Sequence, residues 1–190
     1  HRVIDDARSL LDNDDQETEM LDVHLVRELG MCCGGRMHVF LEKVLPEPAL
    51  WVFGFGRVGQ QVARLAKRAG FDVRLVVCGQ SQASIDLDTD IALIESDDAL
   101  QLVSNGDISD RDYVVVMSRD HELDFEIVEK LIPRRLMYLG MIGSRNKWDR
   151  FQQRMHSLGT DESRLETIRC PIGLDIAALT PEEIAISVVG

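Results

Sequence analysis

One motif restricts the possible folds of this chain more than any other, the glycine pattern Gly54-Phe55-Gly56-Arg57-Val58-Gly59. It follows the apolar run Ala49–Phe53, which is typical of a buried strand, and it precedes apolar residues at helical spacing that end at Gly70. In this position the glycines permit a tight turn, the close approach of a ligand phosphate and close contact between helix and sheet. The motif therefore predicts a Rossmann-like α/β fold with a doubly wound parallel sheet.

Short apolar runs alternate with helical patterns along the rest of the chain. We expect further strands at Asp72–Cys78, Ile91–Ile94, Tyr113–Met117 and Met137–Ile142. Strands that alternate with helices form a parallel sheet covered on both faces. The run at 113–117 is continuously apolar, which predicts a central strand.

A short proline-containing linker at Pro46 and Pro48 predicts a domain boundary. We therefore expect residues 1–46 to be the remnant of a smaller N-terminal domain and residues 47–190 to form the Rossmann-like domain. In the first part we predict a helix around Leu10 and a strand at 37–45. The chain starts at His1 rather than at a methionine and ends within the short apolar stretch 184–190, so we expect both of its ends to be cut.

The charge and the cysteine content exclude several classes of protein. The chain has 21 Lys and Arg against 33 Asp and Glu, a formal net charge of −12, which argues against a general nucleic-acid binder. No apolar run approaches the ~18 residues that a membrane helix needs, so we expect no membrane partner. The 4 cysteines match neither a zinc site nor a disulfide scaffold, which favours a reducing, cytoplasmic compartment.

Two further loops are expected at the same sheet edge as the glycine motif, because parallel strands share the edge at which they end. The fourth strand runs into 118–122, and the fifth runs into Gly143-Ser144-Arg145-Asn146-Lys147. Gly143 permits close backbone approach and Ser144 can cap the next helix. Arg145 and Lys147 lie at the start of that helix, where cations oppose the helix dipole unless an anion is bound. The loop therefore indicates a phosphate or another polyanion.

Other candidate residues allow two interpretations each. His121 is either a proton carrier or cofactor ligand, or an ordinary loop residue. Cys33, like its neighbour Cys32, could carry sulfur or bind a metal, or it could be a small buried turn residue. No set of nucleophile, base and orienting group can be assembled, so the sequence favours a binding protein over an enzyme.

The usual adenine-ribose carboxylate of an NAD site is missing from the second strand, which ends Val76-Val77-Cys78-Gly79-Gln80. The first acidic residue after it is Asp86. Either the fold has lost affinity for a dinucleotide, or it binds a different phosphorylated ligand. We therefore expect weak or no NAD binding.

The chain resembles the XdhC/CoxI family of xanthine-dehydrogenase accessory proteins in four sequence blocks. These blocks are Cys33-Gly34-Gly35-Arg36-Met37-His38-Val39-Phe40-Leu41-Glu42, the motif Gly54–Gly59, Tyr138-Leu139-Gly140-Met141-Ile142-Gly143-Ser144-Arg145-Asn146-Lys147, and Cys170-Pro171-Ile172-Gly173-Leu174-Asp175-Ile176 with Thr180-Pro181-Glu182-Glu183-Ile184-Ala185 after it. The family usually has Thr-His-x-His after the fourth strand. Here Ser118-Arg119-Asp120-His121 keeps only the second histidine.

The resemblance implies a chaperone that binds molybdenum cofactor, as molybdopterin or its cytosine dinucleotide form. Such a protein assists sulfuration of the cofactor together with a cysteine desulfurase. It also helps to insert the cofactor into a molybdenum hydroxylase apo-enzyme. The resemblance further implies a possible homodimer. The cofactor phosphate is then expected at Gly54, Gly56, Arg57, Val58 and Gly59 and at the 143–147 loop, with Cys33 or His121 near the molybdenum. An NAD(P)-dependent oxidoreductase and a nucleotide-sensing Rossmann regulatory module remain the alternatives.

Overall fold

The computed structural model describes residues 2–13, 15–25, 27, 34–44, 47–78 and 91–190. The chain divides into two compact units, residues 1–46 and residues 47–190. Across these described ranges, no helix has both the length and the apolar character needed to span a bilayer. That the first unit is a remnant of a larger N-terminal domain stays a prediction.

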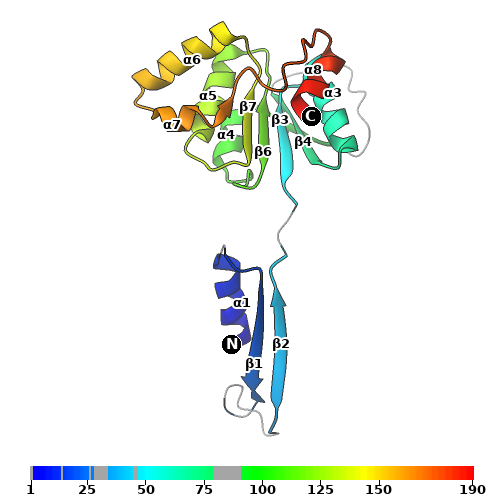
Figure 1. The fold of residues 1–190 in the computed structure, drawn as a ribbon, viewed down its shortest axis with the longest axis vertical. Helices are drawn as coiled ribbons and strands as arrows, with labels where there is room; N and C mark the ends of the chain where they lie inside the picture. Colours follow the sequence, from blue (N-terminus) through cyan, green and yellow to red (C-terminus); the bar gives the residue numbers. More distant parts are fainter. Residues whose placement is uncertain (1, 14, 26, 28–33, 45–46, 79–90) are drawn as a thin grey trace. The chain divides into compact units, whose positions relative to one another are not determined.

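The first unit is one helix beside a two-stranded antiparallel sheet (Figure 1). Helix α1 spans Arg2–Asp12, and strands β1, Thr18–His24, and β2, Arg36–Glu42, pair from Thr18 with Glu42 to His24 with Arg36. Leu10, Leu21 and Val23 are its buried apolar residues. The helix and the second strand were predicted; β1 was not, because acidic residues interrupt its apolar positions.

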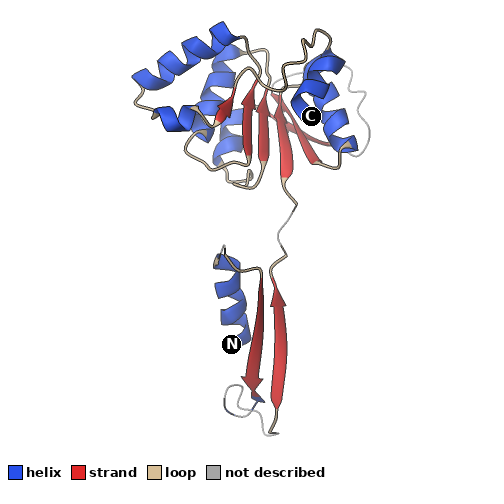
Figure 2. Ribbon diagram, viewed as in Figure 1, coloured by secondary structure: helices blue, strands red, loops and turns tan. Residues whose placement is uncertain are grey.

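The second unit is built on a six-stranded sheet whose strands are all parallel (Figure 2). The strands are β3 (Ala49–Phe53), β4 (Asp72–Cys78), β5 (Ala92–Ser96), β6 (Tyr113–Val116), β7 (Tyr138–Met141) and β8 (Ile168–Arg169). Their order in the sheet is β5-β4-β3-β6-β7-β8. The predicted doubly wound α/β fold is therefore confirmed, and β6 is central as expected.

Helices cover both faces of this sheet because successive strand residues point to opposite sides. The helices are α3 (Arg57–Arg68), α4 (Ala99–Ser104), α5 (His121–Leu131), α6 (Arg145–Ser157), α7 (Glu162–Leu165) and α8 (Pro181–Val189). Trp51 and Phe53 face a core shared with α4, α5, α6 and α7, whereas Leu50 and Val52 face a core shared with α3 and α8. The two layers are visible on either side of the sheet in Figure 1.

The strand order reverses between β3 and β6, because the chain runs outward from β3 to β5 and then returns to β6. In such sheets ligands bind where the strands end, at this reversal. The described loops at that edge include 54–56 after β3, 117–120 after β6 and 142–144 after β7. A fourth stretch, residues 170–180, carries the chain from β8 to α8, which packs against α3; we call it the connecting segment.

Two glycines of the motif are required by packing. A Cβ atom on Gly59 would collide with the carbonyl oxygen of Gly54, and one on Gly54 would collide with that of Met117. Gly54 also has a φ of 141°, which residues with a side chain rarely adopt. The absence of these two side chains lets α3 begin directly against the ends of β3 and β6.

We predict that Gly59→Ala destabilises the fold by about 3 kcal/mol or more, because its new methyl group would meet rigid backbone. Gly56→Ala is the matched control: a Cβ there would meet nothing within 4 Å. Its free energy of unfolding should stay within about 0.5 kcal/mol of the parent. Urea denaturation followed by circular dichroism measures both, and equal stability of the two variants would contradict the packing role of Gly59.

Candidate functional site

The helices that follow β3, β6 and β7 begin at the carboxyl edge of the sheet, and two of these three have a side-chain cap. The Asp120 carboxylate accepts the N–H groups of Glu122 and Leu123 at the start of α5, at 2.9 and 3.2 Å. Ser144 caps α6 as predicted, accepting the Lys147 N–H at 3.2 Å. Gly56, at the corresponding position of α3, makes no side-chain cap bond. The start of α3 is therefore the one of these three helix starts without a side-chain cap.

The space next to this uncapped start is open. A Cβ atom on Gly56 would meet no atom within 4 Å, in contrast to one on Gly54 or Gly59. Arg57 is exposed and Val58 is half-buried against the core that α3 and α8 share. Packing thus does not explain the glycine at position 56, whereas the close approach of an anion to the helix N–H groups does. These residues fit a bound phosphate.

Lys147 does not present its charge to such an anion. Its ammonium lies 2.8 Å from the carboxylate of Asp124 and 3.1 Å from the carbonyl oxygen of Ile142. The Asp124 side chain is 0% exposed and also accepts the N–H and the hydroxyl of Ser118, at 3.1 and 2.7 Å. The buried carboxylate therefore accounts for this cation at the start of α6, and no ligand is needed to explain it.

Gly143 also has a packing role. A Cβ atom there would lie 2.9 Å from the side chain of Lys147 and 3.3 Å from the sulfur of Cys170. The absent side chain makes room for these neighbours, so close approach of a ligand is not needed to explain it. Burial raises the pKa of the Cys170 thiol to about 11, despite the opposing effect of the nearby Lys147. At neutral pH this sulfur is consequently a protonated thiol and a poor nucleophile.

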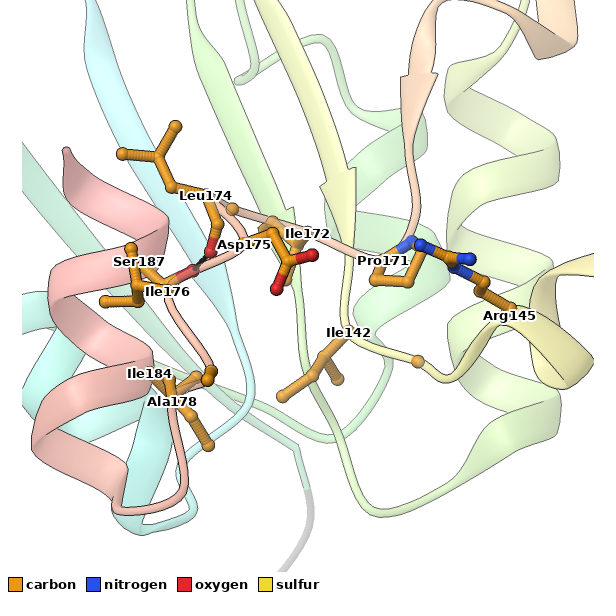
Figure 3. Close-up of a pocket in the computed structure, with 13 residues that line it drawn as sticks. Ile142, Arg145, Pro171, Ile172, Leu174, Asp175, Ile176, Ala178, Ile184 and Ser187 are labelled. Carbon is orange, nitrogen blue, oxygen red and sulfur yellow. Dashed lines mark hydrogen bonds between the residues drawn. The ribbon is translucent and has the colours of Figure 1, made fainter.

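A pocket of about 510 Å³ lies beside these loops, on the side of the connecting segment (Figure 3). Its walls come from the β7–α6 loop, the connecting segment and α8. The lining residues are Ile142, Gly143, Arg145, Pro171, Ile172, Gly173, Leu174, Asp175, Ile176, Ala177, Ala178, Ile184 and Ser187. Of the residues predicted for the site, Gly143 and Arg145 line this pocket.

The remaining predicted residues are not brought to this pocket. His121 is exposed as the first residue of α5. Cys33 lies outside the described residues, as does its neighbour Cys32. The roles expected for His121 and Cys33 stay predictions.

Sequence comparisons identify relatives of the whole second unit. Residues 50–190 match the family described as the XdhC Rossmann domain. The chain is 30% identical over 161 residues to an uncharacterized protein, YqeB, of Escherichia coli, and covers 29% of that protein. It is 29% identical over 152 residues to a Bacillus subtilis protein named as a probable xanthine dehydrogenase subunit, covering 44% of it. The shares of this chain in these two alignments are 84% and 80%.

Two further relatives add a named function and a solved structure. A molybdenum cofactor insertion chaperone of Escherichia coli, PaoD, is 24% identical over 139 residues, which are 73% of this chain and 37% of that protein. The crystal structure of a xanthine dehydrogenase from Bacillus halodurans aligns with a TM-score of 0.65 at 26% identity, over 81% of this chain and 45% of that one. The chain spans less than half the length of each of these relatives.

We predict that Lys147→Ala destabilises the protein by about 2–4 kcal/mol, because it leaves the Asp124 carboxylate buried without its cation. Arg145→Ala is the matched control: this arginine is exposed, and its side chain has no hydrogen bond or ion pair with another described residue. Its stability should change by less than about 0.5 kcal/mol. Thermal and urea unfolding of both variants test this, and a Lys147→Ala protein as stable as the control would show that Asp124 does not depend on the ammonium.

Proposed function

The chain belongs to the XdhC family, whose Rossmann domain its residues 50–190 match, and on that premise we propose that it is an accessory protein that binds molybdenum cofactor. It delivers the cofactor to the apo-enzyme of a molybdenum hydroxylase of the xanthine dehydrogenase type. A chaperone function is supported by the name of one relative, the insertion chaperone PaoD, and by the xanthine dehydrogenase names of two others.

The observation that carries this proposal is the open, uncapped start of α3. The N–H groups that follow Gly56 lack a side-chain cap, and the glycine leaves room for a ligand beside them. Molybdopterin ends in a phosphate, or in a pyrophosphate in its cytosine dinucleotide form, and a helix start favours such an anion. Hydrogen bonds from backbone N–H to a charged phosphate contribute about 1.5–3 kcal/mol each. Gly56, Arg57 and Val58 are the residues that hold the phosphate in this proposal.

The role of these residues is to bind and orient the cofactor. When bound, the cofactor supplies the molybdenum centre on which hydroxylation in the client enzyme depends. The thiol of Cys170, next to the β7–α6 loop, is not an activated nucleophile, because its pKa is raised. The partners of the proposed chaperone are the hydroxylase apo-enzyme, a cysteine desulfurase and a second copy of the chain, in the cytoplasm.

We predict that Gly56→Val weakens the binding of molybdopterin at least tenfold, because the new side chain occupies the space of the phosphate. Anaerobic fluorescence titration with molybdopterin released from a molybdenum enzyme measures the effect. The stability of the variant should stay near that of the parent, since the position is open.

Molybdopterin from which the phosphate has been removed is the ligand control. The dephosphorylated ligand should bind the parent more weakly than intact molybdopterin does. Gly56→Val should bind the dephosphorylated ligand as tightly as the parent does. If Gly56→Val left the affinity for intact molybdopterin unchanged, the phosphate would not lie at α3. If the parent did not bind molybdopterin at all, the proposed function would be wrong.

We predict that NAD binds no tighter than about millimolar, because β4 ends at Cys78 rather than at a carboxylate that could hold the ribose hydroxyls. Isothermal titration calorimetry with NAD and NADP measures this affinity. A micromolar dissociation constant would favour an NAD(P)-dependent oxidoreductase over the chaperone.

A further inference from the structure

The pocket of about 510 Å³ beside the connecting segment has a volume in the range of small-molecule sites. Apolar side chains such as Ile142, Ile172 and Ile176 form part of its walls, and the polar part of the lining is equally large. Flat ring systems bury their faces against walls of this kind. The pocket does not include the glycine motif, so its ligand chemistry has to be deduced separately.

Two charged side chains of opposite sign come from different walls of this pocket. Arg145 extends from the start of α6, and Asp175 extends from the connecting segment into the space between the walls (Figure 3). Neither side chain has a hydrogen bond or ion pair with another described residue. A lone phosphate would meet the negative charge of Asp175, so an anion by itself does not fit. A ligand that offers both N–H donors and acceptor atoms does.

The pocket lies at the carboxyl edge of the sheet, with its Ile142, Ile172 and α8 walls on the face that α3 covers. Ile142 and Ile172 pack against the core to which Phe55 and Val58 also contribute. Strand β7 is separated from β3 by β6 alone, so their ends are about 10 Å apart, two interstrand spacings. A ligand with three fused rings and a phosphate arm has a length of this order. One molecule can therefore reach both places.

We propose that this pocket binds a heterocycle with a 2-amino-4-oxopyrimidine edge, the edge that pterins share with guanine. The Asp175 carboxylate accepts the 2-amino group and the adjacent ring N–H as a bidentate pair. Arg145 donates to the ring carbonyl oxygen, as arginine does to O6 of guanine. This assignment rests on the proposed function, from which it takes the pterin ring of molybdopterin as the occupant. The phosphate then lies at α3.

Titration with 6-hydroxymethylpterin, which is fluorescent and has no phosphate, tests the pocket in the full chain. The parent should bind it at least tenfold more tightly than 6-hydroxymethyllumazine, in which an oxo group replaces the 2-amino group. Asp175→Asn should abolish this preference, because the amide offers one acceptor oxygen and turns an NH2 donor toward the second N–H of the ring. Asp161→Asn is the matched control, since Asp161 is exposed and lies outside the pocket, and its substitution removes the same charge.

Arg145→Gln should weaken the binding of 6-hydroxymethylpterin and of 6-hydroxymethyllumazine by a similar factor of at least five. Both compounds carry the carbonyl group to which Arg145 donates. Gly56→Val should leave the affinity for 6-hydroxymethylpterin unchanged. An Asp175→Asn protein that still prefers the pterin over the lumazine would overturn the proposal. So would a parent that fails to bind 6-hydroxymethylpterin.

A parallel titration with guanosine monophosphate distinguishes the two sources of the ring edge. If guanosine monophosphate bound more tightly than 6-hydroxymethylpterin and this binding were lost in Asp175→Asn, the proposed ring recognition would be supported. The natural occupant of the pocket would then be a guanine nucleotide. If molybdopterin binds through Gly56 while 6-hydroxymethylpterin does not bind, the pocket assignment alone fails. If 6-hydroxymethylpterin binds through Asp175 and molybdopterin does not bind, the proposed function alone fails.

Discussion

The contact between Gly59 and the carbonyl oxygen of Gly54 determines where α3 begins. Since neither residue has a side chain, the first turn of the helix lies directly at the ends of β3 and β6. Helix α3 in turn supplies the surface on which α8 packs, and together they cover one face of the sheet. The connecting segment ends at α8. The position of that end therefore depends on α3, and through α3 on the close approach of Gly59 to Gly54.

A second fixed point is the carboxylate of Asp124. It joins the loop after β6, through Ser118, to the loop after β7, through Lys147. Burying such a pair contributes little net stability, because both ions lose their hydration. The pair holds the two loops in a fixed geometry. It also neutralises the charge of Lys147, one of the two cations at the start of α6. Arg145 is then the cation of that loop whose charge faces the pocket.

Much of the fold could be predicted from the sequence, because it depends on local patterns. The glycine motif, the apolar runs and the helical spacing identified strands β3 to β7 with small errors at their ends. Strand β8 and helix α7 have 2 and 4 residues, too few for a periodic pattern. The cap at Ser144 was also predictable, since capping depends on neighbouring residues in the chain.

The site was less predictable because it depends on contacts between distant residues. Asp124 looks like an exposed helical residue in the sequence, and only the fold brings Lys147 and Ser118 to it. The charge at the start of α6 was therefore assigned to a ligand instead. The part of Asp175 in the pocket was missed for a related reason. It lies in a segment without helix or strand, whose path across the sheet no local pattern specifies.

The path of the connecting segment has a consequence for the order in which the protein matures. One wall of the pocket, at Ile142 and Arg145, is synthesised about 30 residues before the wall at Asp175, and helix α8 follows later still. A ribosome delivers the chain from its N-terminus, and domains fold as units during synthesis. A nascent chain that already has its complete sheet consequently still lacks one side of the pocket. The start of α3, by contrast, belongs to residues 54–58, so the residues proposed to bind the phosphate leave the ribosome before those proposed to bind the ring.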